Sequence, residues 1–329
     1  MSPARQTIVS GARPTGQLHL GNYHGAIKSW LRLQHEHECL FFVADWHALT
    51  TDWSASQDIA RNTIDMVLDW LAIGLDPARC TIFQQSAVAA HAELYLLLGM
   101  LTPVPWLERN PTYKEQQQQI EGRDLSTFGF LGYPVLQAAD VLIYKASFVP
   151  VGIDQAPHIE LAREIARRFN TTYREIFPEP QTLLTETPKI VGTDGRKMSK
   201  SYGNAVYLTE DPAEIDQKLS RMITDPRRAR RTDPGVPDDC PAYTSLHSIY
   251  CTPDELAWAS QGCRTAGIGC LECKKVMIKH VLAELEPMRA RRAALRADDA
   301  RAVLEAGNRR ARDVAEATMR EVRDAMGLS

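Results

Sequence analysis

One apolar run constrains the fold of this chain more than any other feature. Residues 39–44 are continuously apolar, without the alternation of a strand that has one face in water. Strands of this kind are buried on both faces, as in parallel sheets that helices cover. Asp45, His47 and Thr50 follow, so we expect them at the carboxyl end of the strand, where open α/β sheets bind ligands. A capping role for Asp45 and a buried structural role for His47 are equally compatible with these positions.

Short β-branched or apolar runs alternate with helical patterns. The expected strands are residues 7–9, 39–44, 81–83 and 149–151. Helical patterns begin near Gly21 and cover about residues 56–73 and 133–144. Ser54 or Ser56 is the expected N-cap of the second helix, and Gly74 ends it. This alternation predicts a doubly wound, Rossmann-like α/β fold with a parallel sheet.

Size and composition set broad limits. The chain has 329 residues, of which 44% are hydrophobic and 24% charged, as in ordinary globular proteins. This length predicts two domains. Residues 1–10 lack the charged and long apolar regions of a signal peptide, and the longest apolar run, residues 94–101, is too short to span a membrane. We therefore expect a cytoplasmic protein without a membrane segment.

One segment is unusually rich in hydrogen-bond donors. Residues 197–201 read Lys-Met-Ser-Lys-Ser, on a loop that Gly192 and Gly195 make adaptable. Two ammonium groups and two hydroxyls can bind several phosphate oxygens at once. The segment predicts a polyphosphate ligand, and a solvated basic loop is the alternative.

A second candidate phosphate site lies near the N-terminus. Between the first expected strand and the first helix, the loop 11–22 contains Gly11, Gly16 and Gly21. Glycines let the backbone approach a ligand, and a helix N-terminus favours negative charge. His19 can donate a hydrogen bond to phosphate oxygens as charge develops on them. A plain turn of the chain is the alternative explanation for the glycines.

These two segments resemble the signatures of one enzyme class. Residues 197–201 are similar to the KMSKS signature of class I aminoacyl-tRNA synthetases, and residues 15–22 to their HIGH signature, in the form that ends in Asn. From residue 10 to residue 201 the chain resembles the bacterial tryptophanyl-tRNA synthetases. The resemblance implies a Rossmann-like catalytic domain at residues 1–205. It also implies a smaller all-helical domain at residues 206–329 that binds the tRNA anticodon.

The resemblance implies an ATP site. His19, Lys197 and Lys200, together with Mg²⁺, would stabilise charge on the departing pyrophosphate. Asp154 would hold the ribose hydroxyls. The other implied ATP contacts are Arg13, Thr15, Gly21, Asn22, Lys114, Gly152, Met198, Ser199 and Ser201. Arg13 is a departure, since many relatives have an amide there.

The expected helix around residues 133–144 contains one carboxylate, Asp140. Burial would penalise this charge unless something pairs with it, and a local cap or an ion pair is one explanation. The resemblance implies another, in which Asp140 accepts the indole N–H of tryptophan, a group that can only donate. The other residues of the implied tryptophan pocket are Tyr133, Gln137, Gln155 and His47. Gln137 replaces the methionine of some relatives.

The implied reaction has two steps. Tryptophan reacts with ATP to give tryptophanyl-adenylate and pyrophosphate, and a ribose hydroxyl at the 3′ end of tRNA(Trp) then takes the tryptophanyl group. The family also implies a homodimer. A tyrosine-activating synthetase of the same class and a synthetase-like regulatory protein that charges no tRNA are the alternatives.

Five of the seven cysteines lie between Cys240 and Cys273. In a cytosolic chain such crowding favours a metal site over disulfides. Cys240, Cys263, Cys270 and Cys273 have the spacing C-x22-C-x6-C-x2-C, and four thiolates can hold iron–sulfur or zinc. A subset of bacterial tryptophanyl-tRNA synthetases is similar here and carries a [4Fe-4S] cluster, which implies one in this chain. Zinc and reduced core cysteines are the alternatives, and we expect Cys251 to be a non-ligand.

The net charge of −3 requires that any basic surface for nucleic acid be concentrated on one part of the chain. Such a concentration consists of Arg227, Arg228, Arg230, Arg231, Lys274, Lys275, Lys279, Arg289, Arg291, Arg292 and Arg296. We expect these charges to follow the tRNA backbone. A solvated helix face is the alternative for any single one.

Overall fold

The computed structural model describes residues 5–110, 126–184 and 190–328, except the side chains of Asp52, Ala55 and Asp154. The chain forms two compact units, each made of segments that are distant in sequence. The first unit contains Met1–Gly16, Ser29–Thr185 and Arg296–Ser329, and the second contains Gln17–Lys28 and Glu186–Leu295. The predicted domain boundary after residue 205 stays a prediction.

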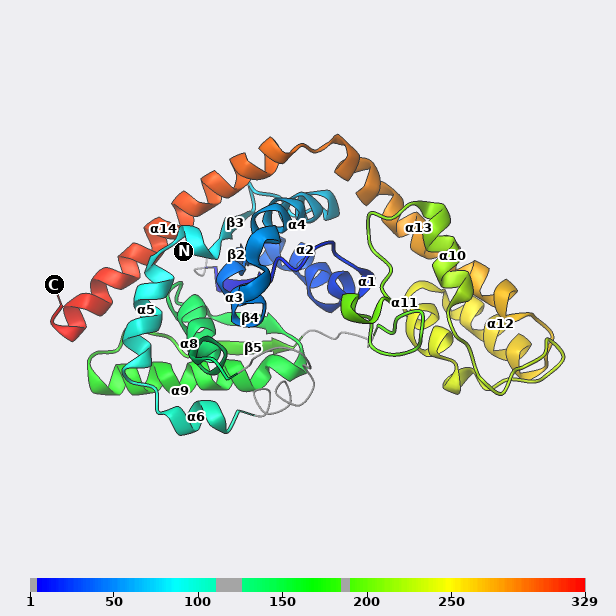
Figure 1. Ribbon diagram of the computed structural model, residues 1–329, viewed down its shortest axis with the longest axis horizontal. Helices are drawn as coiled ribbons and strands as arrows, with labels where there is room; N and C mark the ends of the chain where they lie inside the picture. The colour runs from blue at the N-terminus through cyan, green and yellow to red at the C-terminus, as the bar shows by residue number, and fades with distance from the viewer. Residues whose placement is uncertain (1–4, 111–125, 185–189, 329) are drawn as a thin grey trace. The chain divides into compact units, whose positions relative to one another are not determined.

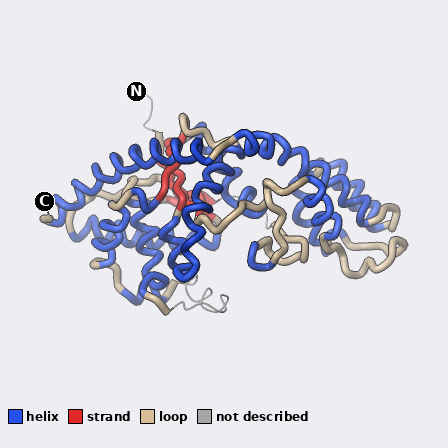
Figure 2. Tube along the Cα trace, turned by 45° about the horizontal axis from the view of Figure 1, so that its top comes forward, coloured by secondary structure: helices blue, strands red, loops and turns tan. Residues whose placement is uncertain are grey.

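A parallel sheet organises the first unit. Its five strands are β1 (Thr7–Ala12), β2 (Glu38–Val43), β3 (Cys80–Gln84), β4 (Phe148–Val151) and β5 (Gln181–Leu184). They lie in the order β3-β2-β1-β4-β5, with Val9 beside Leu40 and Phe42 beside Phe83. All four expected strands are present, and helices surround the sheet (Figure 2). The predicted doubly wound α/β fold is therefore confirmed.

Alternate residues of β2 pack on opposite faces of the sheet. On one face Phe41 stacks on Trp30 of α2 (Lys28–Glu36), with ring centroids 4.5 Å apart, and Trp30 meets Trp70 of α4 (Ile59–Ile73) edge-on. On the other face, Leu40 and Phe42 join the core formed with α5, α8 and α9. These helices are α5 (Ala90–Gly99), α8 (Phe128–Leu142) and α9 (Ala156–Thr172). Burial on both faces explains the unbroken apolar run of this strand.

The predicted start of the helix at residues 56–73 is wrong. Helix α3 (Asp45–Asp52) continues into a 3-10 helix, Trp53–Asp58, and α4 begins only at Ile59. Ser54 and Ser56 lie inside this 3-10 helix, so neither is the N-cap. Short hydroxyl side chains favour turns as well as caps, and the sequence could not separate the two. Gly74 ends α4 as predicted, with φ of 121°.

The last helix of the chain belongs to the first unit. Helix α14 (Ala297–Met326) packs along β3, α4 and α5 (Figure 1). Asn308 Oδ1 accepts the N–H of Gln84 at 2.9 Å, so a side chain of α14 satisfies a donor of edge strand β3. Gly307 lets the helix approach this closely, because a Cβ there would lie 1.8 Å from the carbonyl oxygen of Ile82. The helix therefore covers the edge of the sheet.

Among the residues that the structure describes, the first unit also contains α6 (Val104–Glu108). The second unit is helical, with α1 (Leu20–Asn22), α10 (Pro212–Arg221), α11 (Ser248–Tyr250), α12 (Pro253–Arg264) and α13 (Cys270–Ala294). Its core includes Ile215 and Leu219 of α10, and Ile278 and Val281 of α13. Within the described ranges of the chain, no helix is long and apolar enough to cross a membrane.

Candidate active site

Residues 17–22 of the first signature segment lie in the same compact unit as residues 197–201. Leu20 N–H donates to the carbonyl of Val206 at 3.0 Å, and Leu208 N–H donates to that of Leu18 at 3.0 Å. His19 and Tyr207 thus form an antiparallel bridge. The chain that follows the Lys-Met-Ser-Lys-Ser segment is paired directly with the histidine segment, although nearly the whole sheet separates them in sequence.

His19 is buried and has a defined partner. Its Nδ1 accepts the N–H of Asn22 at 3.3 Å, and Asn22 Oδ1 accepts the N–H of His19 at 3.1 Å. Burial, and then the charge of Lys200, lower the pKa of His19 to about 4. We therefore assign a neutral ring with its proton on Nε2, from which it can be donated to a phosphate oxygen. Gly21 is required here, since a Cβ would lie 2.9 Å from the His19 ring.

The Lys-Met-Ser-Lys-Ser segment is anchored by its methionine. Met198 is buried, whereas Lys197 and Ser201 are exposed. Val191 and Lys197 form a bridge, and the turn between them is closed by a 2.7 Å hydrogen bond from Gly192 N–H to Arg196 carbonyl. Gly195 adopts φ of 78° in this turn, a conformation that favours glycine. The glycines from which we expected an adaptable loop therefore have specific structural roles in this turn.

Asn204 organises the same loop, and sequence reasoning missed it. It is buried, and its Nδ2 donates to Asp194 Oδ1 at 2.7 Å and to the carbonyl of Lys197 at 3.2 Å. Its Oδ1 accepts the N–H of Ser199 at 2.8 Å. Gly203 precedes it with φ of 65°. The Gly-Asn pair directly after the signature was the available signal, because such pairs mark turns.

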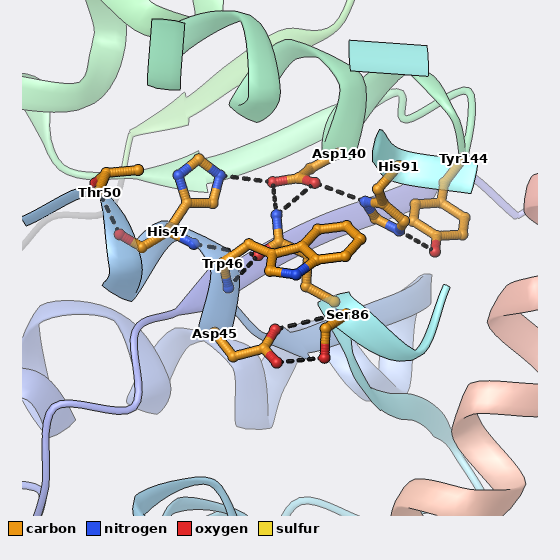
Figure 3. A network of polar contacts seen from close by, with 9 residues as sticks. Asp45, Trp46, His47, Thr50, Ser86, His91, Asp140 and Tyr144 are labelled. Carbon is orange, nitrogen blue, oxygen red and sulfur yellow. Dashed lines mark hydrogen bonds and ion pairs between the residues drawn. The ribbon is translucent and has the colours of Figure 1, made fainter. Parts of the chain in front are cut away.

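In the first unit, Asp45 follows β2 and accepts hydrogen bonds from residues at the end of β3 (Figure 3). Its Oδ1 accepts the N–H of Ser86 at 3.0 Å, and its Oδ2 accepts the Gln84 amide at 2.8 Å and the Ser86 hydroxyl. Asp45 is almost fully buried. The structure therefore gives this carboxylate a positioning role at the carboxyl edge of the sheet.

Asp140 is the centre of a buried network (Figure 3). Its Oδ1 accepts from His91 Nδ1 at 2.6 Å and from Gln85 Nε2 at 2.8 Å. Its Oδ2 accepts from His47 Nε2 at 2.8 Å and from Gln85 Nε2 at 2.9 Å. Burial alone would raise the pKa of Asp140, but the hydrogen bonds from His47 and His91 outweigh it and lower the pKa. The site thus holds an ionised acceptor in a dry environment.

The same face of α8 presents three polar side chains. Tyr133, Gln137 and Asp140 lie three and four residues apart, which places them on one side of the helix. Tyr133 OH lies 2.9 Å from His158 Nε2, whose Nδ1 lies 2.9 Å from Gln155 Oε1. Burial raises the pKa of Tyr133 to about 12, so its hydroxyl stays protonated. The structure therefore joins Tyr133 and Gln155 in one chain of hydrogen bonds.

Two other predicted ATP contacts, Arg13 and Gly152, lie at the carboxyl ends of strands. Arg13 follows β1 and approaches Thr51 Oγ1 at 3.5 Å, and Gly152 follows β4. Lys114 and the Asp154 side chain lie outside the described residues, so these two predictions are untested.

Comparison with known proteins identifies the family. The family model described as "tRNA synthetases class I (W and Y)" matches residues 2–286. The chain belongs to the class I tRNA synthetases. Chains named tryptophan–tRNA ligase from Thermotoga maritima and Aquifex aeolicus are 51% and 46% identical, each aligned over 98% of this chain and 99% of the relative. The predicted resemblance is therefore confirmed.

A solved class I synthetase has the same fold. The tryptophanyl-tRNA synthetase of Campylobacter jejuni, in a crystal structure with ADP and tryptophan, aligns with a TM-score of 0.87 and 30% identity. The alignment covers 98% of this chain and 100% of that one. A tyrosyl-tRNA synthetase from Archaeoglobus fulgidus, at 20% identity and a TM-score of 0.67, shares the fold alone.

The predicted cysteine ligands of this synthetase lie within electrostatic reach of one another. Burial, and then the nearby Cys240, Cys263 and Cys270, raise the pKa of Cys273 to about 12. Its Sγ lies 3.3 Å from His247 Nε2. Among the residues that the structure describes, no three His, Cys, Asp or Glu side chains are grouped as a metal site requires.

Two of the basic residues predicted to follow the tRNA backbone are buried instead. Arg228 donates to the carbonyls of Asp233 at 2.9 Å, Arg231 at 3.1 Å and Ile268. Lys274 Nζ donates to the carbonyls of Ser220 and, at 2.8 Å, Met222, which end α10. Both cations replace missing backbone donors, so the prediction is wrong for these two residues. Arg230 and Arg231 are exposed.

Proposed function

We propose that this class I synthetase is a tryptophan–tRNA ligase, which forms tryptophanyl-adenylate from tryptophan and ATP and then esterifies tRNA(Trp). The observation that carries the proposal is the ionised, buried Asp140 on the same face of α8 as Tyr133. A carboxylate surrounded by protein donors can only accept, and the indole N–H can only donate. The names of relatives at 46% and 51% identity support the same amino acid.

In the activation step, the tryptophan carboxylate attacks the α-phosphorus of ATP. The neutral His19 donates a hydrogen bond from Nε2–H to a phosphate oxygen, while Lys197 and Lys200 balance the charge of the departing pyrophosphate. Mg²⁺ bound with ATP would supply further positive charge to the same phosphates. Asp154 would hold the ribose hydroxyls, with Thr15, Gly21, Asn22 and Gly152 beside the nucleotide. Lys114 would add a further phosphate contact.

The amino acid itself would be held by groups from two hydrogen-bonded sets. Asp140, with His47 beside it, would take the indole, and Tyr133 and Gln155 would orient the ammonium and carboxylate groups. Gln137 lies one helical turn before Asp140 on α8 and would line the same pocket. Fixing both ends of the substrate discriminates it from smaller amino acids.

The experiment that tests this proposal is amino-acid-dependent exchange of labelled pyrophosphate into ATP. We expect exchange with tryptophan and none above background with tyrosine. Exchange with tyrosine alone would transfer the proposal to a tyrosine-activating enzyme. Exchange with neither amino acid, in protein that binds ATP, would favour a synthetase-like regulatory protein.

The helical region at residues 206–329 is proposed to bind the anticodon part of tRNA. The exposed arginines Arg230 and Arg231 support this role, because phosphate contacts need accessible cations. We expect Arg230→Gln to weaken binding of tRNA(Trp) without changing the exchange reaction. An equal loss in both assays would contradict a separate tRNA role for this arginine.

A homodimer is part of the proposal. Large apolar side chains are exposed in neighbouring elements of the first unit: Leu96 (57%), Met100 (72%), Val104 (52%) and Phe128 (76%). The rings of Tyr95 of α5 and Phe128 of α8 have centroids 6.5 Å apart, which connects these elements. Patches of this kind mark interfaces. Light scattering should give a dimer for the native chain and a monomer for Met100→Glu, while Val314→Glu, at an exposed position of α14, should stay dimeric.

A [4Fe-4S] cluster on Cys240, Cys263, Cys270 and Cys273 is the last part of the proposal, with zinc as the alternative metal. The cysteine spacing C-x22-C-x6-C-x2-C supports a common site. Protein purified without oxygen should contain iron and sulfide. Cys263→Ser should lose both, and Cys251→Ser, the matched control, should retain both. Zinc without iron would replace the cluster, and neither metal would leave reduced cysteines.

A further inference from the structure

We infer that His91 is a positioning residue for recognition of the indole, because it holds the Asp140 carboxylate in one orientation while Tyr144 holds His91. The inference rests on the proposed function, in which Asp140 accepts the indole N–H. Sequence reasoning assigned no role to His91, Gln85 or Tyr144. Gln85 and His91 donate hydrogen bonds to Asp140, and His91 also contacts the hydroxyl of Tyr144. Figure 3 shows His91 between Asp140 and Tyr144.

The network has a sealed side and an accessible side. The side chains of His91 and Asp140 are 0% and 1% exposed, and Gln85 is fully buried. His47 is the partly accessible donor, with 12% of its side chain exposed. A ligand N–H must therefore approach Asp140 from the side of His47. His91 and Gln85 lie behind the carboxylate and cannot be the groups that the ligand meets first.

The contacts of His91 determine which of its nitrogens carries a proton. Asp140, ionised, has no proton to give, so the 2.6 Å contact to its Oδ1 requires a proton on His91 Nδ1. In the neutral ring Nε2 then accepts, and the donor at 2.6 Å is the hydroxyl of Tyr144. Burial raises the pKa of Tyr144 well above its ordinary value, which keeps this hydroxyl protonated. Tyr144 thus selects the tautomer of His91 that donates to Asp140.

Gln85 cannot replace this contact. Its single amide nitrogen is shared between both carboxylate oxygens, at 2.8 and 2.9 Å. Its carbonyl oxygen is held by the backbone N–H groups of Trp46 and His47 at 3.2 and 3.4 Å. Without His91, Oδ1 keeps only the shared amide proton, so the carboxylate can rotate and take up a proton in its buried site. Either change weakens acceptance of an indole N–H.

The consequence is specific to the N–H group. A tryptophan analogue in which sulfur replaces the indole nitrogen, benzothienylalanine, fills the same space but donates nothing to Asp140. Loss of His91 should therefore affect tryptophan and leave the analogue nearly unaffected. A purely structural role would lower the rates with both substrates alike.

The test is pyrophosphate exchange with tryptophan and with benzothienylalanine, comparing kcat/KM. For His91→Leu we expect a loss of about 10- to 100-fold with tryptophan, carried by KM for tryptophan, and less than about threefold with the analogue, from the worth of a hydrogen bond to a charged group. His91→Asn keeps a donor near the position of Nδ1 and should retain most of the preference. Tyr144→Phe should lie between them, and Tyr173→Phe, at the exposed C-terminal end of α9, should match the native chain.

Asp140→Leu, which leaves no acceptor for the indole N–H, tests the proposed contact separately from the role of His91. If it leaves the preference for tryptophan over the analogue unchanged, the indole contact in the proposed function is wrong, and the inference on His91 is overturned with it. If Asp140→Leu removes the preference while His91→Leu, or His91→Asn and Tyr144→Phe where His91→Leu does not fold, lowers kcat/KM for both substrates equally, only the inference on His91 is overturned.

Discussion

The close approach of α14 to the sheet predicts a large effect from adding one methyl group. In Gly307→Ala the new Cβ would lie 1.8 Å from the carbonyl oxygen of Ile82 and 2.7 Å from its carbonyl carbon. Carbon–oxygen contacts begin near about 3.3 Å, so helix and strand must separate by about 1.5 Å. Both sides are backbone, which cannot relax by rotating a side chain.

The magnitude follows from two destabilising contributions and one stabilising contribution. Overpacking of this kind costs about 1–3 kcal/mol, and the upper end applies because the clash is with backbone. Separation also weakens the 2.9 Å hydrogen bond from Gln84 N–H to Asn308, a further ~1 kcal/mol. Alanine regains about 1 kcal/mol of helix propensity. We expect a net destabilisation of about 2–3 kcal/mol.

Thermal unfolding followed by circular dichroism measures this effect. For a chain of 329 residues, ~1 kcal/mol shifts Tm by about 1.5 °C, so the midpoint should fall by about 3–5 °C. Val314→Ala, at an exposed position of the same helix, is the control and should leave Tm unchanged or slightly raised. A Gly307→Ala variant as stable as the native chain would refute the reasoning about this contact.

Three further predictions concern the second unit. The His19 imidazole should titrate near pH 4 in NMR spectra of the ligand-free protein. Because this pKa lies below the unfolded value of about 6.5, the contribution of the neutral His19 ring to folding stability is lost as the pH falls from about 6.5 towards 4. A measured pKa near the unfolded value would contradict the assigned neutral ring. Asn204→Ala removes two hydrogen bonds to the Lys197–Ser201 segment and one to Asp194. It should raise KM for ATP and lower kcat in pyrophosphate exchange, with KM for tryptophan unchanged; equal changes in both KM values would point to general unfolding. Lys274→Met leaves the carbonyls of α10 without their donor and should lower the free energy of unfolding by about 1–3 kcal/mol in urea titrations, whereas Lys279→Met on the same helix should have no measurable effect.

The strands and the signature segments were predictable from the sequence because their signals are local. The run at residues 39–44 is apolar since both faces of β2 are covered, and the short runs at 7–9, 81–83 and 149–151 became β1, β3 and β4. The apolar helix around Asp140 was predictable for the same reason. Strand β5 was not predicted.

Hydrogen-bond partners that come from distant segments of the chain could not be predicted from the sequence. Asp140 was predicted to need a partner, but nothing in the spacing pointed to His91, which lies 49 residues earlier on another helix. Likewise, Arg228 and Lys274 look like solvated cations in sequence, and only the fold shows that backbone carbonyls surround them. Ser54 and Ser56 failed as caps because the 3-10 helix before α4 has no strong sequence signal.

The most direct test of the whole account is charging of tRNA. Purified protein, kept free of oxygen, is given ATP, Mg²⁺ and a tRNA(Trp) transcript with labelled tryptophan or labelled tyrosine. We expect that tryptophan alone becomes esterified to the tRNA, and that His19→Ala lowers the rate about 100-fold or more, the effect of removing one donor to a developing charge. Esterified tyrosine, or exchange activity without any charged tRNA, would contradict it.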